Sequence, residues 1–375
     1  MNRFYNPVKT LQGRGAVKGL SSFIQELKAK KALLLVWNEC VCENADLKAA
    51  VAESRETEFK TLVFDKSNPD TGDLYNLYTS TKDEGFDLVI AVGGGSVMDM
   101  AKSLCCLYGN ELSSEEEVRS GIKEKRFTAP AAKWIGVPTT AGTGSEVTCW
   151  ATVWNTVEKG KLSLESHNNY AYGALVDPQF ASTMPPSLAV SSALDAAAHA
   201  TEAYWAKASN LVSRTYALKA ISIIMDNIED LFDKEKNAQA HDCMAQGSLL
   251  AGLAFSNTKT TACHSLSYPL TLKYGIPHGV AVSMLIAPVM AVNMAAVEDM
   301  RPLFAAYGVA SVEALEEKIN GILDLAGIPH GISRWGAERG DFPLLSMSCK
   351  TKGRIDNNPV DLTEETIVKI LNSIF

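Results

Sequence analysis

The feature that most constrains the fold is an apolar run that leads directly into three glycines and then into a helical pattern. Residues 87–92 read DLVIAV, residues 93–96 read GGGS, and residues 97–108 read VMDMAKSLCCLY. This order predicts a buried strand, a tight turn and a helix. Consecutive glycines let a backbone approach a pyrophosphate closely, and the free N–H groups of a helix start favour the anion. Taken alone, the triplet also fits a tight turn that binds nothing.

Three further short apolar runs lie at 32–36, 61–64 and 134–137, and amphipathic segments separate them. Uninterrupted runs of this length are typical of parallel strands that are covered on both faces. The pattern therefore predicts a doubly wound α/β fold up to about residue 180. After MPPS the sequence becomes rich in Ala and Leu with helical spacing, which predicts an all-helical second half. The predicted domains are residues 1–184 and 185–375.

A second polar loop follows the run at 134–137, and it reads VPTTAGTGSEVT over residues 137–148. Its hydroxyls and glycines are denser than in an ordinary connection. Four side chains can donate hydrogen bonds to phosphate or ribose: Thr139, Thr140, Thr143 and Ser145. Two such loops at the carboxyl ends of neighbouring strands mark a nucleotide crevice, so together they favour a dinucleotide over an empty turn.

The charge balance, the N-terminal sequence and the cysteine spacing argue against a nucleic-acid-binding, membrane-spanning or secreted protein. The chain of 375 residues has 35 Lys and Arg against 43 Asp and Glu, without a basic run, so we expect no nucleic-acid partner. The most apolar stretch, residues 279–297, is interrupted by polar residues and proline and predicts a buried helix instead of a membrane span. The N-terminus lacks a secretory signal and the eight cysteines lack framework spacing, so we expect a cytoplasmic protein with free thiols.

The helical half contains residues that suit a metal ion. Asp195 and His199 are four residues apart in a predicted helix, so they face the same side. Alanines surround the pair, which predicts that it is buried and needs partners, although the spacing alone also fits a surface pair. With His264 and His278 the set has three imidazoles and a carboxylate, which suits Fe2+, Zn2+, Mn2+ or Ni2+. Three histidines are interpreted as surface or satisfied polar residues: His167, His241 and His330.

Together these motifs resemble the iron-containing alcohol dehydrogenase family, also called group III dehydrogenases. The resemblance covers essentially the whole chain and rests on five segments in the family's order: GGGSVMDMAK, PTTAGTGSEVT, DP at 177–178, DAAAH at 195–199 and the stretch from His264 to His278. The glycine motif alone would also fit the dehydroquinate synthase and glycerol dehydrogenase branches, whereas the threonine-rich loop favours the alcohol dehydrogenase branch. The resemblance implies a Rossmann-like N-terminal domain, an all-helical C-terminal domain, an active site in the cleft between them and a homodimer.

The resemblance also implies roles for individual residues. The cofactor would be NAD or NADP, and the divalent ion would be Fe2+ before Zn2+. The implied metal ligands are Asp195, His199, His264 and His278. The implied cofactor-binding residues are Asn68 on the adenosine side, Gly94, Gly95 and Ser96 at the pyrophosphate, Asp99 in the same motif, Thr139, Thr140 and Thr143 along the cofactor, and Lys161 at the ribose.

Three positions depart from the family's pattern. Asn38 stands after the first strand, where an aspartate often binds the ribose 2′-OH and repels a 2′-phosphate, so NADPH is not excluded. Tyr268 stands four residues after His264, where many members have a histidine for proton transfer, and tyrosine is a poorer relay near neutral pH. Lys259 precedes His264 by just over one turn if residues 249–264 are helical, and would offer a positive charge to an anionic group. A solvated lysine is the alternative.

Lys259 together with HSLSYPLT at 264–271 resembles the branch that reduces phosphonoacetaldehyde to hydroxyethylphosphonate. We therefore expect a metal-dependent oxidoreductase that transfers hydride between NAD(P)(H) and a small primary alcohol or aldehyde, including one with an anionic head group. Tyr268 and Lys259 are the candidate catalytic residues. Three alternatives remain open: a metal-free reductase of the maleylacetate type, a dehydroquinate-synthase-like lyase that uses NAD transiently, and a non-catalytic nucleotide-binding protein.

Overall fold

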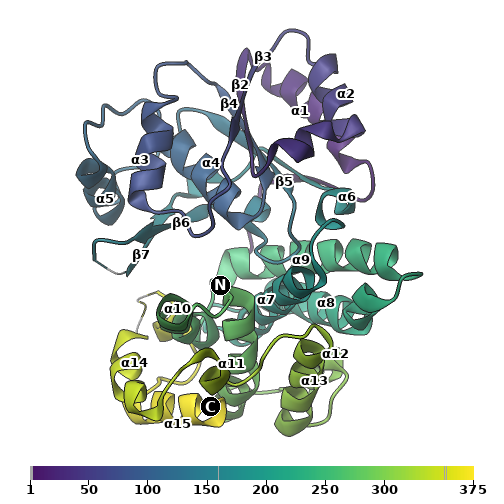
Figure 1. The fold of residues 1–375 in the computed structure, drawn as a ribbon, viewed down its shortest axis with the longest axis vertical. Helices are drawn as coiled ribbons and strands as arrows, with labels where there is room; N and C mark the ends of the chain where they lie inside the picture. The colour runs from purple at the N-terminus through teal and green to yellow at the C-terminus, as the bar shows by residue number, and fades with distance from the viewer. Residues whose placement is uncertain (1–2, 159, 350, 352) are drawn as a thin grey trace. The chain divides into compact units, whose positions relative to one another are not determined.

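The structure, a computed structural model, describes residues 3–158, 160–349, 351 and 353–375. Its internal contacts divide the chain into two compact units (Figure 1). The α/β unit comprises residues 6–140 and 145–181. The helical unit comprises the described residues from Ser182 onward, the loop at 141–144 and the described residues before Asn6.

Six parallel strands form the main sheet of the α/β unit, in the order β1-β8-β5-β4-β2-β3. Their bounds are β1 (Lys9–Gln12), β2 (Lys31–Val36), β3 (Glu58–Val63), β4 (Leu88–Gly93), β5 (Lys133–Pro138) and β8 (Gly173–Val176). The four apolar runs in the sequence correspond to β2, β3, β4 and β5, which confirms the α/β prediction. The strands β1 and β8 of this sheet were not predicted. Nor were β6 (Trp150–Asn155) and β7 (Gly160–Glu165), which pair as an antiparallel hairpin.

The order of the strands creates a switch point between β2 and β4. From β2 the chain moves outward to β3, returns to β4 on the other side of β2, and then continues to β5 and β8. The connections that follow β2 and β4 therefore leave in opposite directions. In doubly wound sheets, ligands bind at such a point, outside the carboxyl ends of the strands.

Helices cover both faces of this sheet. One face packs against α1 (Leu20–Leu27), α2 (Ala45–Glu53) and the 3-10 helix η1 (Ala16–Gly19), and the other packs against α3 (Thr71–Thr79), α4 (Gly95–Leu107) and α5 (Glu115–Lys123) (Figure 1). Alternate residues of β2 point into the two cores: Leu33 and Leu35 into one, Leu34 and Val36 into the other. Because both faces are covered, every residue of β4 is buried, and this explains its uninterrupted apolar sequence.

The helical unit is built around α7 (Pro186–Trp205), whose residues from Ala193 onward are all buried. It packs against α8 (Leu211–Asn227), α9 (Asn237–Thr258) and α11 (His278–Asn293). The other helices are α6 (Pro178–Ala181, in the α/β unit), α10 (Ala262–Tyr274), α12 (Arg301–Tyr307), α13 (Val312–Leu325), α14 (Phe342–Ser348) and α15 (Glu364–Ser373). The predicted all-helical second half is confirmed, and Pro186 lies in the first turn of α7, where proline is tolerated.

Short 3-10 helices complete the described secondary structure: η2 (Glu39–Glu43), η3 (Ser145–Val147), η4 (His167–Asn169), η5 (Glu229–Phe232), η6 (Ile332–Trp335), η7 (Arg339–Asp341) and η8 (Ile355–Asn357). Within the described ranges, no helix is both long and apolar enough to span a membrane. The apolar stretch 279–297 lies largely in the buried helix α11. All eight cysteines are free thiols, and five of them are buried.

One expectation about helical continuity is wrong, because residues 249–264 do not form a single helix. α9 ends at Thr258, and α10 begins at Ala262. Between them Lys259 has φ +62° and ψ 179°, a combination that is found almost only at glycine. Asn357 stabilises the break, since its side-chain amide donates to the Thr258 carbonyl at 2.7 Å and to the Thr260 carbonyl at 3.1 Å. The direction of Lys259 therefore cannot be inferred from helical spacing.

Candidate functional site

The helical unit brings the four predicted metal ligands together. Asp195 and His199 lie on the same side of α7, His264 lies in the first turn of α10, and His278 is the first residue of α11. His264 Nε2 is 3.4 Å from Asp195 Oδ1, and His278 Nε2 is 3.8 Å from the same oxygen. His199 Nδ1 is 3.9 Å from Asp195 Oδ2. Three of the side chains are buried, whereas that of His278 is 37% exposed.

The polar atoms at the centre of this cluster fit a metal ion. Asp195 Oδ1, His199 Nδ1 and His264 Nε2 are buried and have no hydrogen-bond partner among the described residues. One ligand atom from each of these three residues lies within 4.8 Å of the others. An unpartnered buried polar group costs about 1–3 kcal/mol, so three in one place need a common explanation. A borderline divalent ion, which binds imidazole nitrogen and carboxylate oxygen, would satisfy all three.

The electrostatics of the cluster also suit a cation. Burial opposes charge on Asp195, but the three histidines outweigh it and hold the pKa of that carboxyl well below its usual range. Burial lowers the pKa of His199 to about 3, so its imidazole is neutral and keeps a lone pair for ligation. For His264 burial is outweighed by the carboxylates of Glu202 and Asp195, which raise its pKa to about 10. The cluster therefore favours a positive charge, either a proton or a metal ion.

Aromatic rings border the cluster. Phe255 of α9 stacks on His199 with ring centroids 4.2 Å apart. Tyr268 of α10 lies nearly parallel to His278, with centroids 5.7 Å apart and an interplanar angle of 10°. The structure thus places Tyr268, one turn after His264, beside the most exposed of the four ligands. Its role in proton transfer stays a prediction.

The sequence reasoning missed Glu202, which is fully buried beside His264. Its Oε2 lies 2.5 Å from His264 Nδ1. A signal was present in the sequence, because Asp195, His199 and Glu202 follow the spacing i, i+4, i+7 that defines one face of a helix.

In the α/β unit, the glycine turn and the threonine-rich loop lie side by side. Gly93 and Pro138 are partners in the β4–β5 register, and Thr139 N donates to the Gly93 carbonyl at 3.1 Å. A Cβ on Gly94 would come within 3.3 Å of the Thr140 side chain. Gly94 caps α4 without a side-chain hydrogen bond, so the N–H groups of the first turn, which includes Gly95 and Ser96, are available to an anion.

The other predicted cofactor-binding residues lie in several separate elements outside the glycine turn. Asn38 follows β2 at the switch point, and its side chain accepts a hydrogen bond from Cys40 N at 2.8 Å. Asn68 is exposed with φ +52°, in the connection between β3 and α3, and Lys161 lies in β7. Thr143 groups with the helical unit, unlike Thr139 and Thr140.

Asp99 and Lys102 of α4 form a buried polar network with the end of the threonine-rich loop and the start of β6. Asp99 accepts hydrogen bonds from Ser145 Oγ and Thr152 N, each at 2.9 Å. The Lys102 ammonium is fully buried and donates to Ser145 Oγ, Thr148 Oγ1 and the Trp150 carbonyl at 2.7, 2.9 and 3.0 Å. In this structure the Asp99 side chain organises the loop; its contact with a cofactor stays a prediction.

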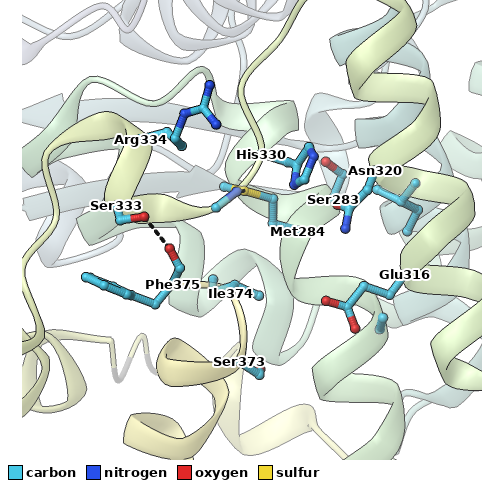
Figure 2. A pocket seen from close by; sticks show the side chains of 13 residues that line it. Ser283, Met284, Glu316, Asn320, His330, Ser333, Arg334, Ser373, Ile374 and Phe375 are labelled. Atoms are coloured by element: carbon cyan, nitrogen blue, oxygen red, sulfur yellow. Dashed lines mark hydrogen bonds between the residues drawn. The ribbon is translucent and has the colours of Figure 1, made fainter.

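A separate cavity of about 320 Å³ lies in the helical unit (Figure 2). Apolar side chains such as Met284, Ile319 and Ile374 line it together with the charged side chains of Glu316 and Arg334. None of its lining residues is a predicted site residue, so it is distinct from the metal cluster.

Comparison with known proteins gives matches along nearly the whole chain. Residues 7–178 match the family model "Iron-containing alcohol dehydrogenase", and residues 189–375 match "Fe-containing alcohol dehydrogenase family, C-terminal". The NAD-dependent methanol dehydrogenase of Bacillus methanolicus is 28% identical, with 100% of both chains covered. The sulfoacetaldehyde reductase of Bilophila wadsworthia is 26% identical, covering 99% of this chain and 98% of the relative. The solved alcohol dehydrogenase of Oenococcus oeni superposes with a TM-score of 0.88 at 26% identity, covering 100% of each chain.

Proposed function

The chain belongs to the iron-containing alcohol dehydrogenase family, and from this premise we propose the reaction that its site performs. The protein is a metal-dependent oxidoreductase that transfers a hydride between a nicotinamide dinucleotide and a small primary alcohol or aldehyde. The observation that carries the metal dependence is the set of three buried, unpartnered ligand atoms on Asp195, His199 and His264. These residues and His278 would hold the ion, with Fe2+ as the first choice and Zn2+ as the second.

When bound, the ion supplies Lewis acidity to the oxygen of the substrate. Residues of the chain around this site would balance its charge, stack on its ligands and orient the substrate. The Asp195 carboxylate would offset part of the dication's charge, and Phe255 stacks on the His199 ring. His278 is the most exposed ligand, so we place the substrate's approach on its side of the cluster. Tyr268, which lies along the His278 ring, would orient the substrate or pass a proton.

The nucleotide would bind at the glycine turn of the α/β unit. The N–H groups at the start of α4 and the hydroxyls of Thr139 and Thr140 offer donors to a pyrophosphate, and Gly94 leaves room for it beside Thr140. Asn38 at the end of β2 carries no charge that would repel a 2′-phosphate, so both NADH and NADPH are candidates.

We extend the proposal to substrates with an anionic head group, for which Lys259 is the candidate partner. The support is twofold: one relative is a sulfoacetaldehyde reductase, and Lys259 holds a backbone conformation that non-glycine residues rarely adopt. Strained residues persist only where the surrounding structure maintains them, and they are found preferentially at active sites and ligand-binding positions. Phosphonoacetaldehyde and sulfoacetaldehyde are therefore the first substrates to test.

The test is oxidation of NADH and of NADPH by Fe2+-loaded and Zn2+-loaded protein on acetaldehyde, propionaldehyde, phosphonoacetaldehyde and sulfoacetaldehyde. The proposal expects metal-dependent turnover, with higher kcat/KM for the anionic aldehydes. Full activity of metal-free protein would instead favour the maleylacetate-type reductase. Turnover of a substrate without net production or consumption of NAD(P)H would favour the dehydroquinate-synthase-like lyase.

A further inference from the structure

Glu202 connects the ligand His264 to the start of α10. Its Oε2 faces His264 Nδ1 at 2.5 Å. Its Oε1 accepts hydrogen bonds from Thr261 Oγ1 at 2.7 Å, from Cys263 N at 2.6 Å and from His264 N at 3.4 Å. The carboxylate is fully buried. One side chain of α7 thus holds both the imidazole and the backbone from which that imidazole extends.

The donors around Glu202 leave it only one role, that of acceptor. Cys263 N is a backbone amide and can only donate. Thr261 Oγ1 accepts a hydrogen bond from Trp205 Nε1 at 2.8 Å, so its own proton is directed to Glu202. His264 also donates a hydrogen bond to the Glu202 carboxylate when its Nδ1 carries the proton. Since neutral imidazole has one protonated nitrogen, Nε2 then keeps its lone pair, and Nε2 is the atom that faces Asp195.

We propose that Glu202 is a positioning residue of the metal centre: it fixes His264 in the tautomer and orientation that present Nε2 to the ion, and it provides the second buried carboxylate that brings a divalent centre to neutrality. The inference rests on the proposed function, in that it requires a metal ion at Asp195, His199 and His264. With three neutral imidazoles, the charges of Asp195 and Glu202 balance those of the dication. A neutral centre is less costly to bury than a charged one.

The substitution Glu202→Gln tests this role because the amide is close in shape but offers only one acceptor oxygen. If the amide oxygen faces Cys263 N and Thr261, the NH2 group faces His264 Nδ1 and favours the tautomer with the proton on Nε2, which blocks ligation. If the amide is turned the other way, its NH2 group meets Cys263 N–H, donor against donor. Either arrangement should weaken metal binding.

The matched control is Thr201→Val, which changes the preceding residue of α7. Thr201 is equally buried, but its hydroxyl lies 2.6 Å from Tyr307 OH and bonds to the Ala197 carbonyl, and neither residue is a metal ligand. This variant perturbs the core of α7 without touching Glu202. Glu202→Asp is the conservative variant, because it keeps the charge and shortens the reach.

The experiment measures Co2+ affinity by chelator competition and records the visible spectrum of the Co2+-loaded protein. We expect Glu202→Gln to lose ~10–100-fold in affinity and to show an altered spectrum, Glu202→Asp to recover part of the affinity, and Thr201→Val to match the wild type.

Wild-type affinity and spectrum in Glu202→Gln would overturn the inference. If Glu202→Gln does not fold, Glu202→Asp decides, and unchanged affinity and spectrum in that variant would overturn it equally. Failure of the wild type itself to bind Co2+ would overturn the proposed function, a result that is distinguishable from the other two.

Discussion

Gly279 lies so close to Ser191 that a Cβ on the glycine would come 2.0 Å from the Ser191 carbonyl oxygen. Gly279 directly follows His278 in α11, and Ser191 precedes Asp195 by one turn in α7. The two helix backbones therefore approach each other where they carry two of the proposed ligands. This approach sets the separation of His278 and Asp195, and it depends on the absence of a side chain at Gly279.

The first prediction is that Gly279→Ala separates α11 from α7. The added Cβ clashes with backbone atoms, which cannot move aside by a change of rotamer. We therefore expect the free energy of unfolding to fall by about 1–3 kcal/mol and the metal affinity to fall with it. Chemical denaturation and Co2+ titration measure the two effects. The control is Gly321→Ala in α13, where an added Cβ meets nothing within 4 Å; it should stabilise the helix by ~0.5–1 kcal/mol. Equal behaviour of the two variants would contradict this account of the packing.

The residue pattern was sufficient to predict part of the metal cluster, namely the pair of ligands that shares one face of a helix. Asp195 and His199 are one turn apart, and a helical period alone places them side by side. The pattern could not show that His264 and His278 reach the same point, since this depends on how α10 and α11 pack; the family resemblance supplied that expectation. Glu202 was missed because a glutamate in a helix is usually solvated, and only tertiary contacts reveal the four hydrogen-bonding groups around its carboxylate.

The second prediction concerns the buried ammonium of Lys102. Lys102→Met leaves Ser145 Oγ, Thr148 Oγ1 and the Trp150 carbonyl without their common hydrogen-bond donor. Burial lowers the pKa of the Lys102 ammonium, and these three hydrogen bonds offset part of the cost of burying it. Breaking such a buried network costs about 3–5 kcal/mol. We expect a lower denaturation midpoint and a several-fold weaker affinity for NADH, measured by fluorescence titration. Lys123→Met, which removes only an exposed ion pair with Glu158, should cost under about 1 kcal/mol and leave NADH binding intact; similar losses in both variants would argue against the network.

The third prediction concerns the choice of cofactor. Asn38→Asp keeps the hydrogen bond to Cys40 N but adds a negative charge at the carboxyl end of β2. If the adenosine ribose binds there, kcat/KM for NADPH should fall roughly tenfold, which is about 1.4 kcal/mol, while that for NADH is kept or improved. Asn44→Asp is the control, because Asn44 is also an N-cap in the α/β unit. A parallel change with both cofactors would place the ribose elsewhere.

The fourth prediction separates strain from function at Lys259. Lys259→Gly relieves a backbone conformation that costs on the order of 1–3 kcal/mol, so the variant should be more stable than the wild type. The same variant removes the ammonium and should lose ~10-fold or more in kcat/KM for phosphonoacetaldehyde relative to acetaldehyde. Lys259→Met should lose the selectivity without gaining stability, and Lys219→Met on the exposed surface of α8 should do neither. Unchanged selectivity in both Lys259 variants would remove this residue from substrate recognition.

The break at Lys259 and the grouping of the loop at 141–144 show where sequence patterns reach their limit. Residues 249–264 have helical spacing throughout, yet Asn357, about a hundred positions away, stabilises the interruption. Similarly, a Cβ on Gly142 would meet Ser192 of α7, a contact that no local pattern indicates. Both features depend on residues that are distant in sequence, whereas the four apolar strands β2, β3, β4 and β5 and the glycine turn follow from local patterns alone.

The central claim, a metal ion bound by Asp195, His199, His264 and His278 and required for hydride transfer, is tested most directly by metal analysis. Wild-type and His264→Ala proteins are purified anaerobically, and metal content is measured alongside oxidation of NADH and NADPH with the aldehyde panel; His167→Ala, an exposed histidine outside the cluster, is the control. We predict about one ion per chain in the wild type and the control, and loss of both metal and activity in His264→Ala. A His264→Ala protein that keeps full metal content and activity, or a metal-free wild type that is fully active, would contradict the claim.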